Sequence, residues 1–105
     1  MDEGSTGPDK LTDLRMLRET LSPFAERIGE VQTTAIQVQA MQKAQRPGTV
    51  SRVIAMRNDV DAIYRDMERA LFTLPEKLRT HSRVDDLRKA LARLETIIDE
   101  LNVED

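Results

Sequence analysis

Apolar residues recur at alternating intervals of three and four through most of this chain, and this spacing constrains its fold more than any other feature. Intervals of three and four place side chains on one face of a helix, as in a coiled-coil seam or the core face of a helical bundle. The longest run lies in the first half and comprises Leu14, Leu17, Leu21, Phe24, Ile28, Val31, Ala35 and Val38. The sequence therefore predicts an all-α fold.

The segment Gln45 to Thr49, Gln-Arg-Pro-Gly-Thr, is the strongest reverse-turn signal inside the chain. Long helical patterns lie on both sides of it, which predicts an antiparallel helical hairpin. We expect helix 1 over about 9–45 and helix 2 over about 50–74. A second regular seam follows and predicts helix 3 over about 83–101, through Val84, Leu87, Leu91, Leu94, Ile98 and Leu101. The expectation is a three-helix bundle with coiled-coil-like heptad seams, forming a single domain over 9–102.

The helix ends carry weaker signals. Residues 1–8 are small, polar and contain glycine and proline, which predicts a disordered tail. Pro23 interrupts helix 1, but the heptad stays in phase through it, so we expect a kink rather than a break. Thr49 or Ser51 is expected to cap helix 2, and Ser82 is expected to cap helix 3.

Composition excludes several classes of protein. The chain has 105 residues, of which 33% are charged and 3% aromatic, and this balance suits extended helices. A net charge of -3 makes nucleic acid an unlikely partner. No apolar run approaches the ~20 residues of a membrane span. The acidic N-terminus lacks the apolar centre of a signal peptide, so a cytoplasmic location is expected by default.

Few residues suggest chemistry. The chain has no cysteine, and its one histidine, His81, is expected in the link between helices 2 and 3 as a solvated side chain. Catalysis by histidine needs an orienting partner and a nucleophile, and metal binding needs further ligands at definite spacing. Neither pattern occurs, and no phosphate loop or EF-hand motif is present. We expect no catalytic residue, no cofactor and no metal site.

A stripe of leucines near the N-terminus predicts an interaction surface. Measured from the turn, helix 2 is too short to cover the first part of helix 1, which carries Leu11, Leu14, Leu17 and Leu21. Helix 1 could fold back at Pro23, residues 76–82 could continue beside it, or a second chain could pair with it. A row of exposed leucines is unfavourable in water. We favour the third solution, as a homo-oligomer or hetero-complex, because helix 3 also carries a heptad seam.

A second candidate surface lies towards the turn. No acidic residue occurs from Val31 to Asn58, and apolar residues such as Val31, Ile36 and Met41 reach more than one helix face. Arg46 and Arg52 add positive charge near the turn. The sequence thus predicts a non-enzymatic protein–protein interaction module that serves as a small subunit, adaptor or chaperone of a larger assembly. A nucleic-acid contact through the basic hairpin tip is an alternative, although no aromatic residue there offers a stacking platform.

Two family resemblances supply further alternatives. A long first helix followed by two shorter ones is similar to the all-helical chorismate mutases, which are intertwined dimers. Arg15, Lys43 and Arg57 would correspond to their basic substrate-binding positions, but helix 3 offers only a leucine seam.

The length and mid-chain turn also resemble the small secreted WxG-type helical hairpins. In this chain the turn is Arg46-Pro47-Gly48 and no tryptophan is present. Tyr64 and Glu68 match the spacing of that family's export signal, but they are expected inside helix 2.

Overall fold

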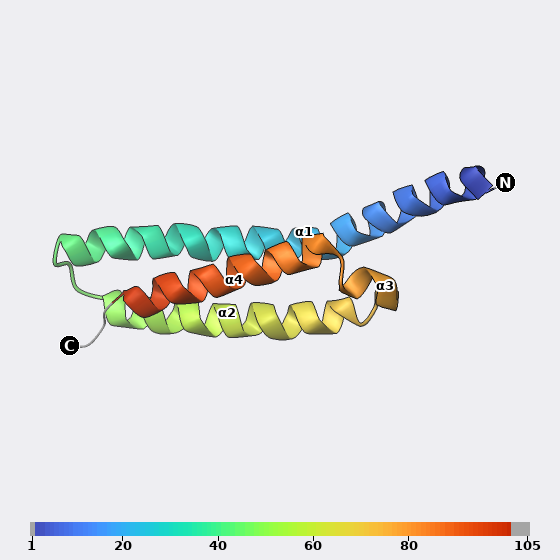
Figure 1. Cartoon of the computed structure of the whole chain (residues 1–105). Coiled ribbons are helices and arrows are strands. Elements are labelled where there is room, and N and C mark those ends of the chain that lie inside the picture. Colours follow the sequence, from blue (N-terminus) through green and yellow to red (C-terminus); the bar gives the residue numbers. More distant parts are fainter. Residues whose placement is uncertain (1, 102–105) are drawn as a thin grey trace.

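The computed structural model describes residues 2–101 of the chain, with side chains described from Leu11 onward. It confirms the all-α prediction, and the described residues contain no strand. The helices are α1 (Asp2–Lys43), α2 (Thr49–Leu71), the short α3 (Glu76–Arg79) and α4 (Ser82–Glu100). Figure 1 shows α2 running back along α1 after the turn, and α4 running beside both in the direction of α1.

The three long helices all pack on one another, and the molecule is elongated, at 65 × 21 × 16 Å. The core between them is apolar, with no buried polar or charged side chain among the described residues. From Leu17 to Val38, the heptad residues of the first half fill it from α1, because an interval of three and four keeps them on one face. The other contributions come from Val53, Met56, Val60, Ile63, Met67, Leu71, Leu74, Leu78, Val84, Leu91, Leu94, Ile98 and Leu101.

Helix α1 is longer at its start than the sequence predicts. The structure begins it at Asp2, so residues 2–8, expected as a disordered tail, continue the helix, while Met1 lies outside the described residues. The expectation rested on glycine and proline content, and such propensities are a weak guide to helix boundaries. The helix also runs unbroken through Pro23. The expected kink at Pro23 stays a prediction.

The backbone around Gln45 ends α1 at Lys43, earlier than the predicted position 45. Gln45 adopts the left-handed conformation, with φ of 57°. The Arg46 N–H donates to the Met41 carbonyl at 2.8 Å, and the Gln45 N–H donates to the Gln42 carbonyl at 3.0 Å. These two bonds form a Schellman motif, which satisfies the last carbonyls of the helix.

Helix α2 starts and ends differently from the prediction. Its N-cap is Gly48, with φ of 90° and no side-chain cap, so neither Thr49 nor Ser51 caps it as expected. Instead the Ser51 hydroxyl donates to the Gly48 carbonyl at 3.3 Å. The helix ends at Leu71 rather than at 74, and the Thr73 hydroxyl donates to the Ala70 carbonyl at 2.6 Å. The chain then turns at once into α3.

Helix α4 begins at Ser82, and its N-cap is His81 rather than Ser82. The His81 Nδ1 accepts a hydrogen bond from the Arg83 N–H at 3.1 Å. One of the unpaired N–H groups of the first turn is thereby satisfied. His81 thus lies in the link between helices, as expected, and its half-buried imidazole serves as a cap in place of the usual Ser or Thr oxygen.

Candidate interaction surfaces

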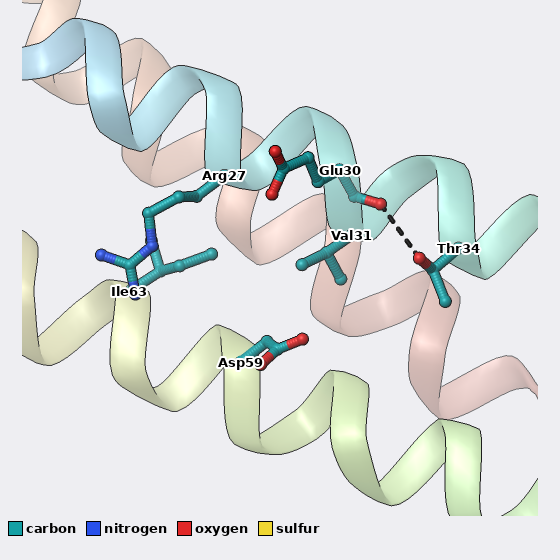
Figure 2. A pocket seen from close by; sticks show the side chains of 6 residues that line it. All are labelled: Arg27, Glu30, Val31, Thr34, Asp59 and Ile63. Atoms are coloured by element: carbon teal, nitrogen blue, oxygen red, sulfur yellow. Dashed lines mark hydrogen bonds between the residues drawn. The ribbon is translucent and has the colours of Figure 1, made fainter.

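The polar side chains at the pocket between α1 and α2 form a hydrogen bond within α1 and an ion pair between the two helices. Figure 2 shows the shallow pocket between α1 and α2, which is lined by Arg27, Glu30, Val31, Thr34, Asp59 and Ile63. Arg27 pairs with Asp66 of α2 at 3.0 Å, and the Thr34 hydroxyl donates to the Glu30 carbonyl at 3.1 Å. Among the described residues, no group of three or more histidine, cysteine or carboxylate side chains could hold a metal ion.

The leucine stripe divides between the core and the surface. Leu17 and Leu21 are buried, whereas Leu14 is 38% exposed and Leu11 is 68% exposed. At this level the Lys77 ammonium of α3 lies 3.1 Å from the Asp13 carboxylate of α1. This contact brings residues 76–79 beside α1, the second of the three solutions considered for the stripe. Leu17 and Leu21 therefore belong to the chain's own core, and the predicted interface narrows to Leu11 and Leu14.

The residues predicted near the turn also divide. Val31 is buried in the core and Met41 is half-buried, while Ile36 is 65% exposed. Arg46 and Arg52 are exposed as expected. The structure thus keeps only part of this candidate surface available to a partner.

The structure adds two apolar residues of α2 to the candidate surface. Val50 is 49% exposed and Ile54 is 55% exposed. One turn further along α2, Arg57 pairs with Asp99 of α4 at 3.3 Å, so this row of α2 points to the side on which α4 packs. Helix α4 ends at Glu100, level with Arg57, so it leaves Val50 and Ile54 uncovered.

Ile36 lies on the same side of the bundle. Ser22 and Ala25 of α1 line a pocket with Leu87 of α4, so this face of α1 points towards α4. Ile36 lies three turns beyond Ala25 and four turns beyond Ser22, and therefore on the same face. The register set by Arg27 and Asp66 places Ile36 close to the level of Arg57. We call Ile36, Val50 and Ile54 the tip patch. Figure 1 shows α1 continuing past the end of α4 towards this tip.

Exposed cations lie towards the same end of α1 and α2 as the tip patch. Lys43, Arg46 and Arg52 are exposed, and no acidic residue occurs between Val31 and Asn58. None of these three cations forms an ion pair with a described residue. The tip therefore combines exposed aliphatic side chains with unneutralised positive charge.

Two arginines, one in α3 and one in α4, form contacts within the fold. Arg79 donates to the carbonyls of Leu71 and Phe72, both at 3.1 Å, and its guanidinium lies 5.1 Å from the Phe72 ring centre. Arg88 pairs with Glu68 at 2.9 Å. Phe72 is 71% exposed, and no sequence signal marked it for this contact with arginine.

The surroundings of Tyr64 perturb its protonation. Partial burial raises the pKa of Tyr64, and the negative charge of Glu95 and a hydrogen bond to its carboxylate at 3.4 Å raise it further. A phenol held protonated in this way joins α2 to α4. Its hydrogen bond to Glu95 is one of the contacts between these two helices.

The residues suggested by family resemblance do not converge within one chain. Arg15 and Lys43 lie near opposite ends of the bundle, about 40 Å apart along α1 at the usual helical rise. Arg57 is engaged with Asp99. Tyr64 and Glu68 lie inside α2 as expected.

The chain matches no protein-family model, and no curated protein or solved structure is significantly similar to it. Within residues 2–101, no helix is long and apolar enough to cross a membrane. The candidate function is therefore argued from the surfaces alone.

Proposed function

We propose that this chain is a non-enzymatic helical protein–protein interaction module that acts as a small subunit, adaptor or chaperone of a larger assembly. The observation that supports the proposal is the exposure of the tip-patch residues Ile36, Val50 and Ile54, which lie towards the turn between α1 and α2. Isolated exposed aliphatic residues are common, but several of them at one end of a small molecule are typical of a binding surface.

The inner seams support the same function. Their three-and-four spacing is that of coiled-coil-like bundles, which recognise other helices by the same packing of side chains between turns. The mixed character of the tip favours a protein partner over nucleic acid. Binding to phosphate uses cations and stacking aromatics, whereas the tip presents aliphatic side chains beside its arginines.

Site-specific photo-crosslinking in the cells that produce the protein tests this proposal. A benzophenone amino acid replaces Ile54, and a matched variant carries it at Arg65, an exposed position elsewhere on α2. We expect a discrete crosslinked protein at position 54 that is absent at position 65. Equal crosslinking at both positions, or none at position 54, would refute the tip as a binding surface.

The crosslinked partner then supports a quantitative test. After purification, we expect the double substitution Ile36→Gln and Ile54→Gln to weaken its binding by at least about tenfold. Helix content should stay unchanged by circular dichroism, because both side chains are exposed. Unchanged affinity in the folded double variant would place the contact elsewhere.

A further inference from the structure

One outward-facing row of α1 combines exposed apolar ends with a small centre. Its members follow one another at alternating intervals of four and three, so they share a face just outside the core face. We call it the outer row: Leu11, Arg15, Arg18, Ser22, Ala25, Gly29, Gln32 and Ile36. All of these residues are exposed except Gly29, which is half-buried. Leu11 and Ile36, at its two ends, are 68% and 65% exposed.

Gly29 has no evident purpose within the chain's own fold. A glycine inside a helix costs about 1 kcal/mol relative to alanine. A Cβ built at Gly29 meets nothing within 4 Å, so no neighbour in this chain requires the missing side chain. The bare backbone at Gly29 would allow a helix of another molecule to approach closely.

The groove beside the outer row lies between α1 and α4, and ion pairs do not bridge it among the described residues. Arg27 and Asp66 join α1 to α2, while Arg57 with Asp99 and Arg88 with Glu68 join α2 to α4. Within the described part of the chain, no ion pair joins α1 to α4. That groove instead holds a shallow pocket lined by Arg18, Leu21, Ser22, Ala25, Arg83, Asp86 and Leu87.

We propose that the outer row is a self-association surface, on which α1 of a second copy packs antiparallel. The proposal rests on the proposed function and adds to it a second contact, made with another copy of the same chain. Antiparallel pairing about the midpoint between Ser22 and Ala25 matches the row to itself. The facing pairs are Leu11 with Ile36, Arg15 with Gln32, Arg18 with Gly29, and Ser22 with Ala25, each formed twice.

In this register the exposed apolar residues are covered and the unpaired charged residues find partners. Each exposed Leu11 covers the exposed Ile36 of the second copy, and the small centre lets the two backbones approach closely. Arg18 crosses the bare backbone at Gly29 and reaches Glu26, which stands one turn away on the outer face of the second copy. Arg18 and Glu26 are exposed and form no ion pair with a described residue of their own chain. The pairing supplies two reciprocal ion pairs.

Sedimentation equilibrium of the purified chain, up to about 200 µM, tests the pairing. We expect a monomer–dimer equilibrium that Gly29→Leu weakens at least about tenfold, because the added side chain would meet Arg18 of the second copy. Asn58→Leu adds the same side chain on the exposed face of α2 and serves as the matched control. It should leave the dimer unchanged.

Reversing the charges of Arg18 and Glu26 tests the register of the two paired helices. Arg18→Glu alone and Glu26→Arg alone should each weaken the dimer, and the double variant should restore it, while circular dichroism confirms that every variant is folded. A monomer at all concentrations, or a double variant no better than the single ones, would overturn the proposal. Crosslinking at Ile54, which lies off the outer row, still decides the proposed function in that event.

Discussion

Replacing Gly29 by alanine measures how much this glycine destabilises the folded monomer, separately from any role in association. The position lies in the middle of α1, and a Cβ there meets no atom within 4 Å. The methyl group therefore adds no clash, and the helix gains the difference in propensity, about 1 kcal/mol. For a domain of about 100 residues, this gain raises Tm by about 4–8 °C.

Urea denaturation followed by circular dichroism measures the free energy of unfolding. Low protein concentration keeps any dimer from contributing to that free energy. Ala25→Gly, on the same exposed row, is the matched control and should lose about as much as Gly29→Ala gains. A neutral or destabilising Gly29→Ala would refute the reasoning, because it would mean that the chain itself needs a bare backbone at this site.

Two further predictions concern the link and the α2–α4 seam. His81→Ala should destabilise the chain by about 1 kcal/mol in urea, because the Arg83 N–H loses its acceptor, whereas His81→Asn should keep most of the stability. A loss of similar size in both variants would show that packing, and not the cap, is what His81 provides. Tyr64 is the only tyrosine, so absorbance of the phenolate should report its pKa above the ordinary value in the folded chain and closer to it in Glu95→Gln. Since the folded pKa is the higher one, this contribution to stability is present below the ordinary pKa of about 10 and is lost as the pH rises through the folded value. A phenolate that forms at or below the ordinary pKa in the folded chain would contradict this cause.

The core was the part most open to prediction from sequence. From Leu17 to Val38 every heptad residue assigned to helix 1 is buried, because the spacing alone determines which face turns inward. Helix ends were less predictable. Gln45 ends α1 in a left-handed conformation that glycine usually adopts, and His81 caps α4 in place of the more common serine.

The candidate surfaces could be predicted only in part, because exposure depends on where a neighbouring helix stops. Leu14 and Leu17 belong to the same heptad seam, yet only Leu17 is fully covered, because it joins the core cluster formed with the other helices and Leu14 does not. Val50 and Ile54 are left uncovered for the same kind of reason, since α4 ends before it reaches them. The spacing of apolar residues along one helix contains no information about the length of the next.

Helix α1 therefore has two rows with separate consequences for mutation. Residues of the inner row, such as Leu17 and Val38, are fully buried, so truncating them to alanine costs about 2–5 kcal/mol whatever the chain binds. Residues of the outer row, such as Leu11 and Ile36, contribute little to the folded monomer because they remain exposed. A variant that loses association at full stability can therefore arise only outside the inner row, and that separation makes the outer row and the tip patch testable independently of the fold.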